Sequence, residues 1–88
     1  MNTYRTRFNA RCPQNGASIA YQLEIHTGVV LMVEDIREAV EAIEQGLHED
    51  IADQLCAKFG GSQRLKATHH GVEIETVRPH LAHWAPAG

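Results

Sequence analysis

The chain has 88 residues and a formal net charge of -3. This length provides for one hydrophobic core and argues against a second domain, and a chain so short often gains stability by association, so we expect a homo-oligomer. The acidic balance excludes an overall field that would draw the protein onto nucleic acid or an anionic membrane. Without an apolar leader or a long apolar run, we expect a cytoplasmic protein with no membrane partner.

Two strands are predicted in the first part of the chain. Apolar and polar residues alternate strictly over residues 4–12, which is typical of a half-buried strand. The pair Asn15-Gly16 then favours a tight reversal. Alternation resumes over residues 19–26, so the second strand is expected to return antiparallel to the first.

The hydrophobic period becomes helical between residues 33 and 59. Apolar residues recur every three or four positions on one stripe, which includes Ile36, Leu47 and Leu55. Gly46 interrupts the pattern, because glycine in a helix costs about 1 kcal/mol relative to alanine. The segment is therefore two consecutive helices, or one long helix bent near Gly46.

A second hairpin is predicted from alternation over residues 65–69 and 72–76, joined by His70-Gly71. The predicted fold is α+β: an antiparallel four-stranded sheet with two consecutive helices on one face, in ββααββ order. One domain spans residues 1–79. Residues 80–88, rich in alanine and proline, are interpreted as a flexible C-terminal tail or an oligomer contact.

Cys12 is the first candidate for chemistry. It ends the first predicted strand directly before Pro13 and a turn, where a thiol lies at the rim of the sheet. The alternative is structural, because its register with Phe8 and Ala10 suits a small buried hydrophobe. Cys56, within the helical stripe, is interpreted as a helix residue with no chemistry. In a reducing cytosol we expect both thiols to be free.

The sequence His48-Glu49-Asp50 opens the second helical segment. Acidic residues in a first turn are favoured by the helix dipole whatever else they do. In the functional interpretation, the Glu49 carboxylate accepts two parallel N–H donors from an amidine-like edge of a purine or pterin. His48 is then a proton donor or a substrate contact.

Two further groups of side chains, one of histidines and one of arginines, suggest binding sites. The pair His69-His70 suggests a metal ligand set, but adjacent strand residues point to opposite faces and no ligand spacing appears, so no metal is expected. Arg5, Arg7 and Arg11 share the polar face of the first strand. They are either phosphate contacts for a nucleic acid or a solvated face that Glu24 partly neutralises.

Four short segments resemble, in their order and separation, the 7-cyano-7-deazaguanine (nitrile) reductases of the tunnelling fold. They are Phe-Asn-Ala-Arg-Cys-Pro at 8–13 with Gly16, Met-Val-Glu at 32–34, Leu-His-Glu-Asp at 47–50 and Gly-Val-Glu-Ile-Glu at 71–75. The chain is more similar to the short amidinotransferase-like relatives of these reductases, which act in queuosine- and archaeosine-type modification.

The resemblance implies specific roles. Cys12 would match the nucleophile that adds to the nitrile of 7-cyano-7-deazaguanine and forms a thioimide, and His48 with Glu49 would match the substrate-binding pair. The substrate is expected to be a deazapurine, free or within a nucleic acid. The sites would lie between the subunits of a homo-oligomer.

Two departures from the family pattern shape the expected activity. The family has an aspartate soon after its Cys-Pro turn, which protonates the nitrile nitrogen, but residues 14–19 contain none, so the proton would come from Ser18, His48 or another histidine. Ser18 is also a candidate substrate contact. The NADPH-binding stretch of the reductases is missing, so we expect no cofactor and an amidinotransferase-like reaction. The alternative is a non-catalytic purine- or pterin-binding or assembly module.

Overall fold

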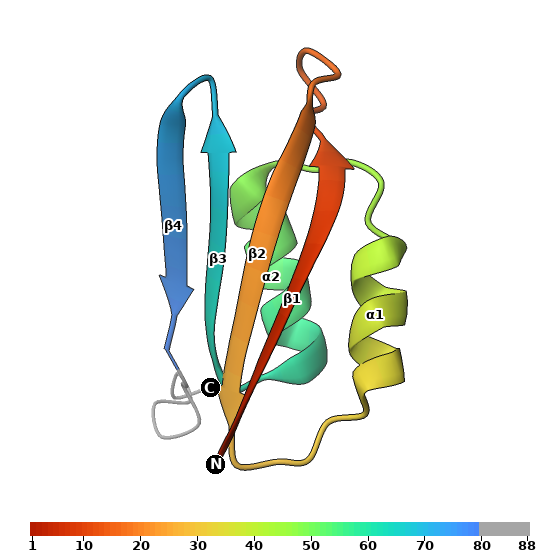
Figure 1. Ribbon diagram of the computed structural model, residues 1–88, viewed down its shortest axis with the longest axis vertical. Coiled ribbons are helices and arrows are strands. Elements are labelled where there is room, and N and C mark those ends of the chain that lie inside the picture. The colour runs from red at the N-terminus through yellow and green to blue at the C-terminus, as the bar shows by residue number, and fades with distance from the viewer. Residues whose placement is uncertain (80–88) are drawn as a thin grey trace, which may run out of the picture.

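The computed structural model of the chain describes residues 1–79, which form a four-stranded antiparallel sheet with two helices against one face (Figure 1). The strands lie in the order β1-β2-β3-β4, so each pairs with its neighbour in sequence. The ββααββ order confirms the predicted α+β fold. The elements are β1 (Asn2–Arg11), β2 (Ser18–Thr27), α1 (Val33–Glu41), α2 (His48–Phe59), β3 (Ser62–His69) and β4 (Val72–Arg78).

Strand alternation builds the core between the sheet and the helices. Phe8 on β1 lies opposite Tyr21 on β2, and their rings stack with centroids 5.1 Å apart. Tyr21 in turn lies opposite Ala67 on β3. All three side chains are buried and face the helices, as the two-residue period of a half-buried strand requires. Leu23, Ile25 and Leu65 continue this buried face.

The predicted helical stripe is divided between two helices, which confirms the first of the two interpretations. Ile36 and Val40 of α1 and Ile51 of α2 are buried. Leu47 is an exception: we expected it on the apolar stripe, but 47% of it is exposed. The reason is local, because Leu47 is the N-cap of α2 and has an extended backbone, so it does not share the helical face.

The linker between the helices is fixed to the end of β1. The amide of Arg11 donates to the carbonyl oxygen of Glu44 at 2.9 Å, and the amide of Gly46 donates to the carbonyl oxygen of Arg11 at 3.2 Å. These bonds accompany a short parallel bridge between Arg11 and Gln45. Because Arg11 precedes Cys12, the pairing brings the first residues of α2 to the end of β1 that carries this cysteine.

The predicted tail, residues 80–88, lies outside the described residues. Within residues 1–79, neither helix is long and apolar enough to cross a membrane.

Candidate active site

A cavity of about 310 Å³ opens between the end of β1, the beginning of α2 and the end of the β3-β4 hairpin. It brings together three of the four site residues predicted from sequence, namely Cys12, His48 and Glu49. Most of its wall is apolar, as is usual for small-molecule sites. Its polar or reactive side chains are those of Cys12, Gln14, Tyr21, His48, Glu49 and His69.

Cys12 is held at the cavity by a closed turn. Its amide donates to the carbonyl oxygen of Ala17 at 2.9 Å, and its own carbonyl accepts from the amide of Gly16 at 2.8 Å. Gly16 has φ of 71°, the left-handed region that glycine adopts without a steric penalty. The Asn-Gly pair thus reverses the chain as predicted. Cys12 is 5% exposed, and it lines the cavity. Its position is therefore consistent with both interpretations, a buried hydrophobic residue and a nucleophile.

His48 presents a hydrogen-bond acceptor to this region. Its Nε2 lies 3.1 Å from the carbonyl oxygen of Leu65. Since a carbonyl only accepts, Nε2 carries the hydrogen in the neutral ring, and Nδ1 has a free lone pair. Nδ1 is buried and has no partner among the described residues. Burial lowers the pKa of His48, and this effect outweighs the hydrogen bond to Leu65 and the charge of Glu49, which act in the opposite direction. The geometry therefore favours a proton acceptor over the predicted proton donor.

Tyr21 lies beside His48 and lines the same cavity as Cys12. Its ring packs against the imidazole of His48 with centroids 5.6 Å apart. Burial raises the pKa of the Tyr21 hydroxyl, and the negative charge of an ionised Cys12 raises it further. Tyr21 is 1% exposed, so it forms a rigid floor for the cavity.

Glu49 is oriented by a cation from the opposite layer. The Arg78 guanidinium on β4 donates from Nη2 to Oε2 of Glu49 at 2.8 Å, and from Nε to Oδ1 of Asp53 at 3.0 Å. Thr76 donates more weakly to the other oxygen of Glu49, at 3.5 Å. A carboxylate has about four lone-pair sites, so Glu49 retains acceptor capacity for a ligand.

His69 lines the same cavity from the end of β3, and its Nε2 is a second buried atom with no partner within residues 1–79. The expectation that His69 and His70 point apart is wrong for their rings, whose centroids are 4.4 Å apart. The reason is that His70 is in the turn, with φ of 51°, and does not continue the strand. The described residues contain no group of three or more side chains arranged to hold a metal ion.

Ser18, the fourth predicted site residue, does not line this cavity. It is exposed at the beginning of β2 and borders a different hollow with Glu41 and Glu44. The structure therefore separates Ser18 from Cys12, although the two residues lie at the two ends of one turn.

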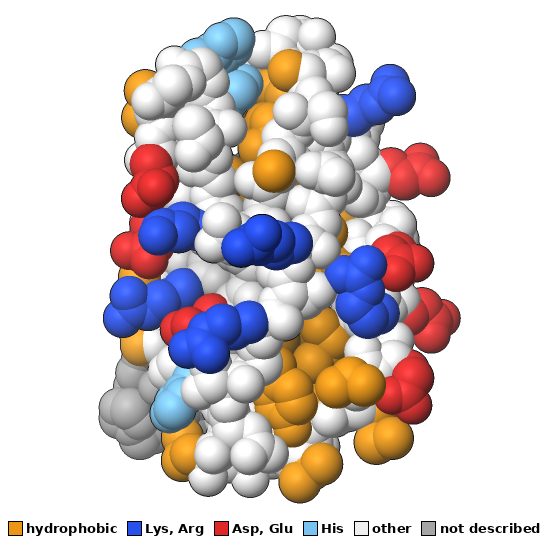
Figure 2. All heavy atoms as spheres, viewed as in Figure 1, with side chains coloured by type: hydrophobic (Ala, Val, Ile, Leu, Met, Phe, Trp, Pro, Cys, Tyr) orange, Lys and Arg blue, Asp and Glu red, His pale blue; other side chains and the backbone are white. Residues whose placement is uncertain are grey.

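The arginine row lies on the open face of the sheet, where basic side chains form a band across the strands (Figure 2). Arg5 pairs with Glu24 at 2.9 Å, as the cross-strand register predicts. Arg64 bridges Glu24 at 3.9 Å and Glu75 at 3.6 Å. These pairs neutralise part of the positive charge and support the interpretation as a solvated face.

Comparison with known proteins adds one relative. No family model matches the sequence, and no curated protein matches it. The crystal structure of the archaeosine synthase QueF-Like in its apo form superposes with a TM-score of 0.64 and 25% sequence identity, over 88% of this chain and 89% of that chain. The chain has a QueF-like tunnelling fold. This finding confirms the fold that the short sequence motifs implied.

The site also contains residues that the sequence patterns did not identify. Tyr21 and His69 were each placed in strands, but neither was assigned to the site. The signal was available, because alternation puts His69 on the same face as Leu65 and Ala67. Arg78 lies beyond the predicted end of the last strand, and the same alternation through Thr76 would have placed it facing α2.

Proposed function

We propose that this chain binds a 7-deazaguanine nitrile in the cavity and forms a thioimide with it through Cys12. The observation that carries the proposal is that Cys12, His48 and Glu49 line one cavity. The similarity to an archaeosine synthase in fold supports the choice of ligand class. The volume of about 310 Å³ is at the small end of the range for ligand pockets, about 300–1,000 Å³, which suits a single fused-ring base.

The cavity groups have complementary tasks in this reaction. Glu49 accepts N–H donors from the amidine-like edge of the base, while Arg78 holds its carboxylate in place. The lone pair of His48 Nδ1 takes the proton of the Cys12 thiol, because the thiolate is the reactive nucleophile. The sulfur then bonds to the nitrile carbon, and one π pair of the C≡N bond moves to nitrogen, which takes a proton.

Transfer fits this chain better than reduction. Attack of ammonia or another amine on the thioimide carbon releases the Cys12 thiolate and leaves an amidine. This route needs no nicotinamide cofactor, and none is proposed. In the reductases the NADPH-binding stretch follows a Val-Glu pair. Here Val33-Glu34 is followed by residues 35–38 of α1, among which Asp35 and Glu38 are exposed. Two exposed carboxylates disfavour the phosphates of a dinucleotide at that position.

The non-catalytic alternative has one specific observation in its favour. Gln14 lines the cavity in the turn after Cys12, and residues 14–19 contain no aspartate, although the family has one soon after its Cys-Pro turn. A carboxamide does not ionise and cannot protonate the nitrile nitrogen. A purine- or pterin-binding module would keep the cavity, Glu49 and Arg78, and would bind its ligand equally well without the Cys12 thiol.

We also propose that the active form is a homo-oligomer. β1 and β4 are the edge strands of the sheet, and edge strands expose unpaired backbone groups that a second copy can satisfy. Ile74 of β4 lines the cavity, so a strand paired to this edge would lie beside the site. Sedimentation equilibrium measures the state directly, and a monomer at micromolar concentration contradicts this part of the proposal.

Intact mass spectrometry after incubation with 7-cyano-7-deazaguanine tests the main proposal. We expect the wild type and Cys56→Ser to gain the mass of the nitrile base, and Cys12→Ala to gain none. Cys56 is a matched control because it is the other free thiol, and burial raises its pKa. An adduct that persists in Cys12→Ala, or no adduct on any variant, contradicts the thioimide. Tight binding without an adduct would instead favour the non-catalytic module.

A further inference from the structure

The cavity contains a proton acceptor but lacks an evident proton donor for the nitrile nitrogen. His48 is a neutral acceptor at Nδ1 by its hydrogen bond to Leu65. Gln14 does not ionise, and Glu49 is engaged as an anion with Arg78 at 2.8 Å. Ser18 faces a different hollow. Among the described side chains that line the cavity, within residues 1–79, this leaves the phenol of Tyr21 and the imidazole of His69.

We propose that His69 is the catalytic proton donor, which protonates the nitrile nitrogen as the Cys12 sulfur bonds to the adjacent carbon. This inference rests on the proposed function and assigns the acid of that reaction.

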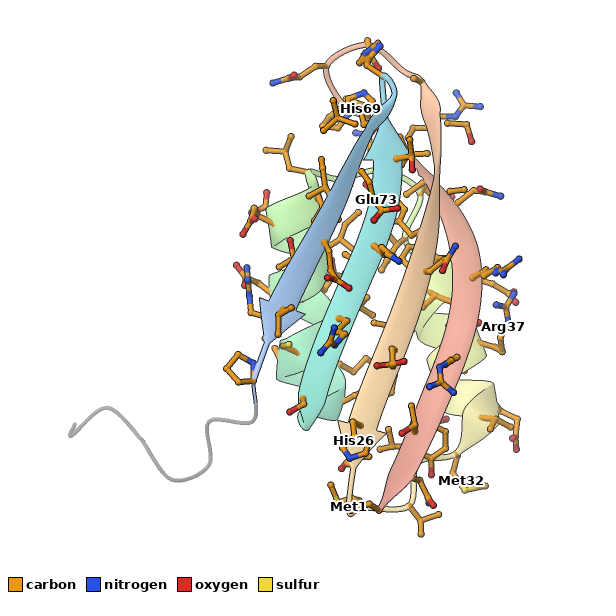
Figure 3. All side chains as sticks on the ribbon, turned by 60° about the vertical axis from the view of Figure 1, so that its left-hand side comes forward. Met1, His26, Met32, Arg37, His69 and Glu73 are labelled. Carbon is orange, nitrogen blue, oxygen red and sulfur yellow. The ribbon has the colours of Figure 1, made fainter. Side chains whose placement is uncertain are left out.

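The register of the sheet brings the two residues to the same end and the same face. Ala10 pairs with Ile19 across β1 and β2, and Ala67 pairs with Tyr21 across β2 and β3. Cys12 follows Ala10 by two residues and His69 follows Ala67 by two residues, so both continue the face that points toward α2. They flank the beginning of β2 from opposite sides, and Figure 3 shows His69 at this end of the sheet, next to the β3-β4 turn.

The His69 ring is fixed in place from outside the cavity. It packs against the ring of His70, with centroids 4.4 Å apart and the two planes tilted by 33°. The Asn15 amide Nδ2 donates to Nε2 of His70 at 3.2 Å. Asn15 also accepts from the amide of Ala17 at 2.9 Å through Oδ1. Because Asn15 belongs to the turn after Cys12, this chain of contacts ties the turn of the nucleophile to the turn of the proposed acid.

The Nε2 atom of His69 is available to a ligand in the cavity. It is buried, and it has no hydrogen-bond partner within the described part of the chain. A buried polar atom without a partner is destabilising, so such atoms in native proteins call for an explanation. A nitrile nitrogen beside Cys12 would provide the partner, and histidine exchanges protons readily near neutral pH.

The step balances with the groups present. The Cys12 thiol gives its proton to His48 Nδ1, and the sulfur lone pair forms the bond to the nitrile carbon. One π pair of C≡N moves to nitrogen, which takes the Nε2 proton of the His69 imidazolium. The products are the thioimide, the imidazolium of His48 and the neutral imidazole of His69. No oxidant, reductant or cofactor takes part.

Tyr21 is the rival donor, and it is the weaker one. Burial raises the pKa of its hydroxyl, and an ionised Cys12 raises it further. A phenol in this setting gives up its proton less readily than an imidazolium. The two candidates are separated by single substitutions, since Tyr21→Phe removes only the hydroxyl and keeps the ring that packs against Phe8 and His48.

The test measures adduct formation with 7-cyano-7-deazaguanine over time by quenched-flow intact mass spectrometry. We expect His69→Gln to slow the adduct rate by about 10²- to 10⁴-fold, the usual contribution of a general acid. We expect His69→Asp, which restores an ionisable donor, to recover at least tenfold over His69→Gln. His26→Gln is the matched control, because His26 is exposed at the opposite end of the sheet (Figure 3).

Binding is measured separately, in the Cys12→Ala background, where no adduct forms. We expect His69→Gln to change the affinity for the nitrile base by less than about threefold, so the loss lies in the chemical step. If His69→Gln does not fold by circular dichroism, His69→Asn removes the acid with a shorter amide and is read in the same way. An adduct rate within threefold of wild type in the folded variant, or a comparable loss in Tyr21→Phe alone, overturns the assignment to His69. A wild type that forms no adduct overturns the proposed function as well.

Discussion

Arg78 and Glu49 are 29 residues apart in sequence, and they meet at 2.8 Å across the interface of β4 and α2. The same guanidinium contacts Asp53, one turn further along the helix, at 3.0 Å. The planar guanidinium group of arginine is well suited to orienting Glu49, because its donors lie in a fixed plane and so fix the orientation of a carboxylate. Glu49 therefore arrives at the cavity already oriented, even though its own side chain is largely exposed.

Arg78→Gln is expected to weaken ligand binding more than it weakens the fold. Exposed ion pairs contribute only about 0–1 kcal/mol each, so the free energy of unfolding should fall by about 1 kcal/mol or less. The affinity for the nitrile base should fall about tenfold, because Glu49 must then be ordered by the ligand. Titration of the base into Cys12→Ala with and without Arg78→Gln measures the affinity, and urea unfolding measures the stability.

Arg37→Gln is the matched control for this experiment. Arg37 pairs with Glu41 at 2.9 Å on α1, away from the cavity (Figure 3). Its loss should reduce stability through its bonds to Thr6 and to the Arg7 carbonyl, and should leave the affinity unchanged. Equal affinity losses for Arg78→Gln and Arg37→Gln would contradict a specific link between Arg78 and Glu49.

His48 should make the fold sensitive to mild acid. Burial lowers the pKa of His48 below its ordinary value of 6.5, so the unfolded chain binds the proton more tightly than the folded chain. Stability therefore falls as the pH falls from 6.5 toward the folded value. We expect the urea midpoint of the wild type to drop more between pH 7.5 and 5.5 than that of His48→Gln. His26→Gln, which removes an exposed histidine, should keep the larger drop, and equal drops for wild type and His48→Gln would refute this account.

The fold could be predicted because local patterns and tertiary structure agree in this chain. The alternation persists along both β1 and β2, and one face is buried along the whole of β2 and at the end of β1, so the register follows from the sequence. The helical segment was ambiguous for a physical reason. Gly46 interrupts the helical pattern, but it does not show whether the helix bends or ends there. The helix ends and a second helix begins because the linker pairs with Arg11, which is distant from the linker in sequence.

The site could be predicted only in part. Cys12, His48 and Glu49 stand in recognisable dipeptides, and each lies at the end of an element. Their chemical states depend on contacts from other strands. Leu65 fixes the tautomer of His48, and Arg78 orients Glu49. Because Leu65 and Arg78 are distant in sequence from the residues that they affect, neither effect can be inferred from the local sequence.

Gly61 is required by a close approach of two strands. It has φ of 71°, and a Cβ added there would lie 2.7 Å from the carbonyl oxygen of His26. Gly71 also has positive φ, 79°, but an added Cβ would meet no atom within 4 Å. Gly71→Ala should therefore cost only the backbone strain, about 1 kcal/mol, and Gly61→Ala should cost about 2 kcal/mol or more. Urea unfolding measures both, and equal costs would rule out the steric contribution at Gly61.

Gly46 should couple energetically to Ile51 and through it to the position of His48. A Cβ on Gly46 would lie 3.0 Å from Cγ1 and 3.4 Å from Cδ1 of Ile51, which is 1% exposed and cannot move outward. Gly46→Ala alone should thus destabilise the fold by about 1–3 kcal/mol through overpacking. Ile51→Ala alone should cost about 2–5 kcal/mol, because it leaves a cavity at this position.

The double variant decides whether the contact is direct. In the Ile51→Ala background the new methyl group at position 46 enters the vacated space. Gly46→Ala should therefore reduce the free energy of unfolding by less than about 0.5 kcal/mol in that background. The resulting coupling energy between the two positions is about 1 kcal/mol or more. Additive costs in urea unfolding would show that Ile51 does not restrict residue 46. Because Gly46 also lines the cavity and precedes Leu47 and His48, the strain of Gly46→Ala should displace the start of α2, and its adduct rate should recover in the double variant.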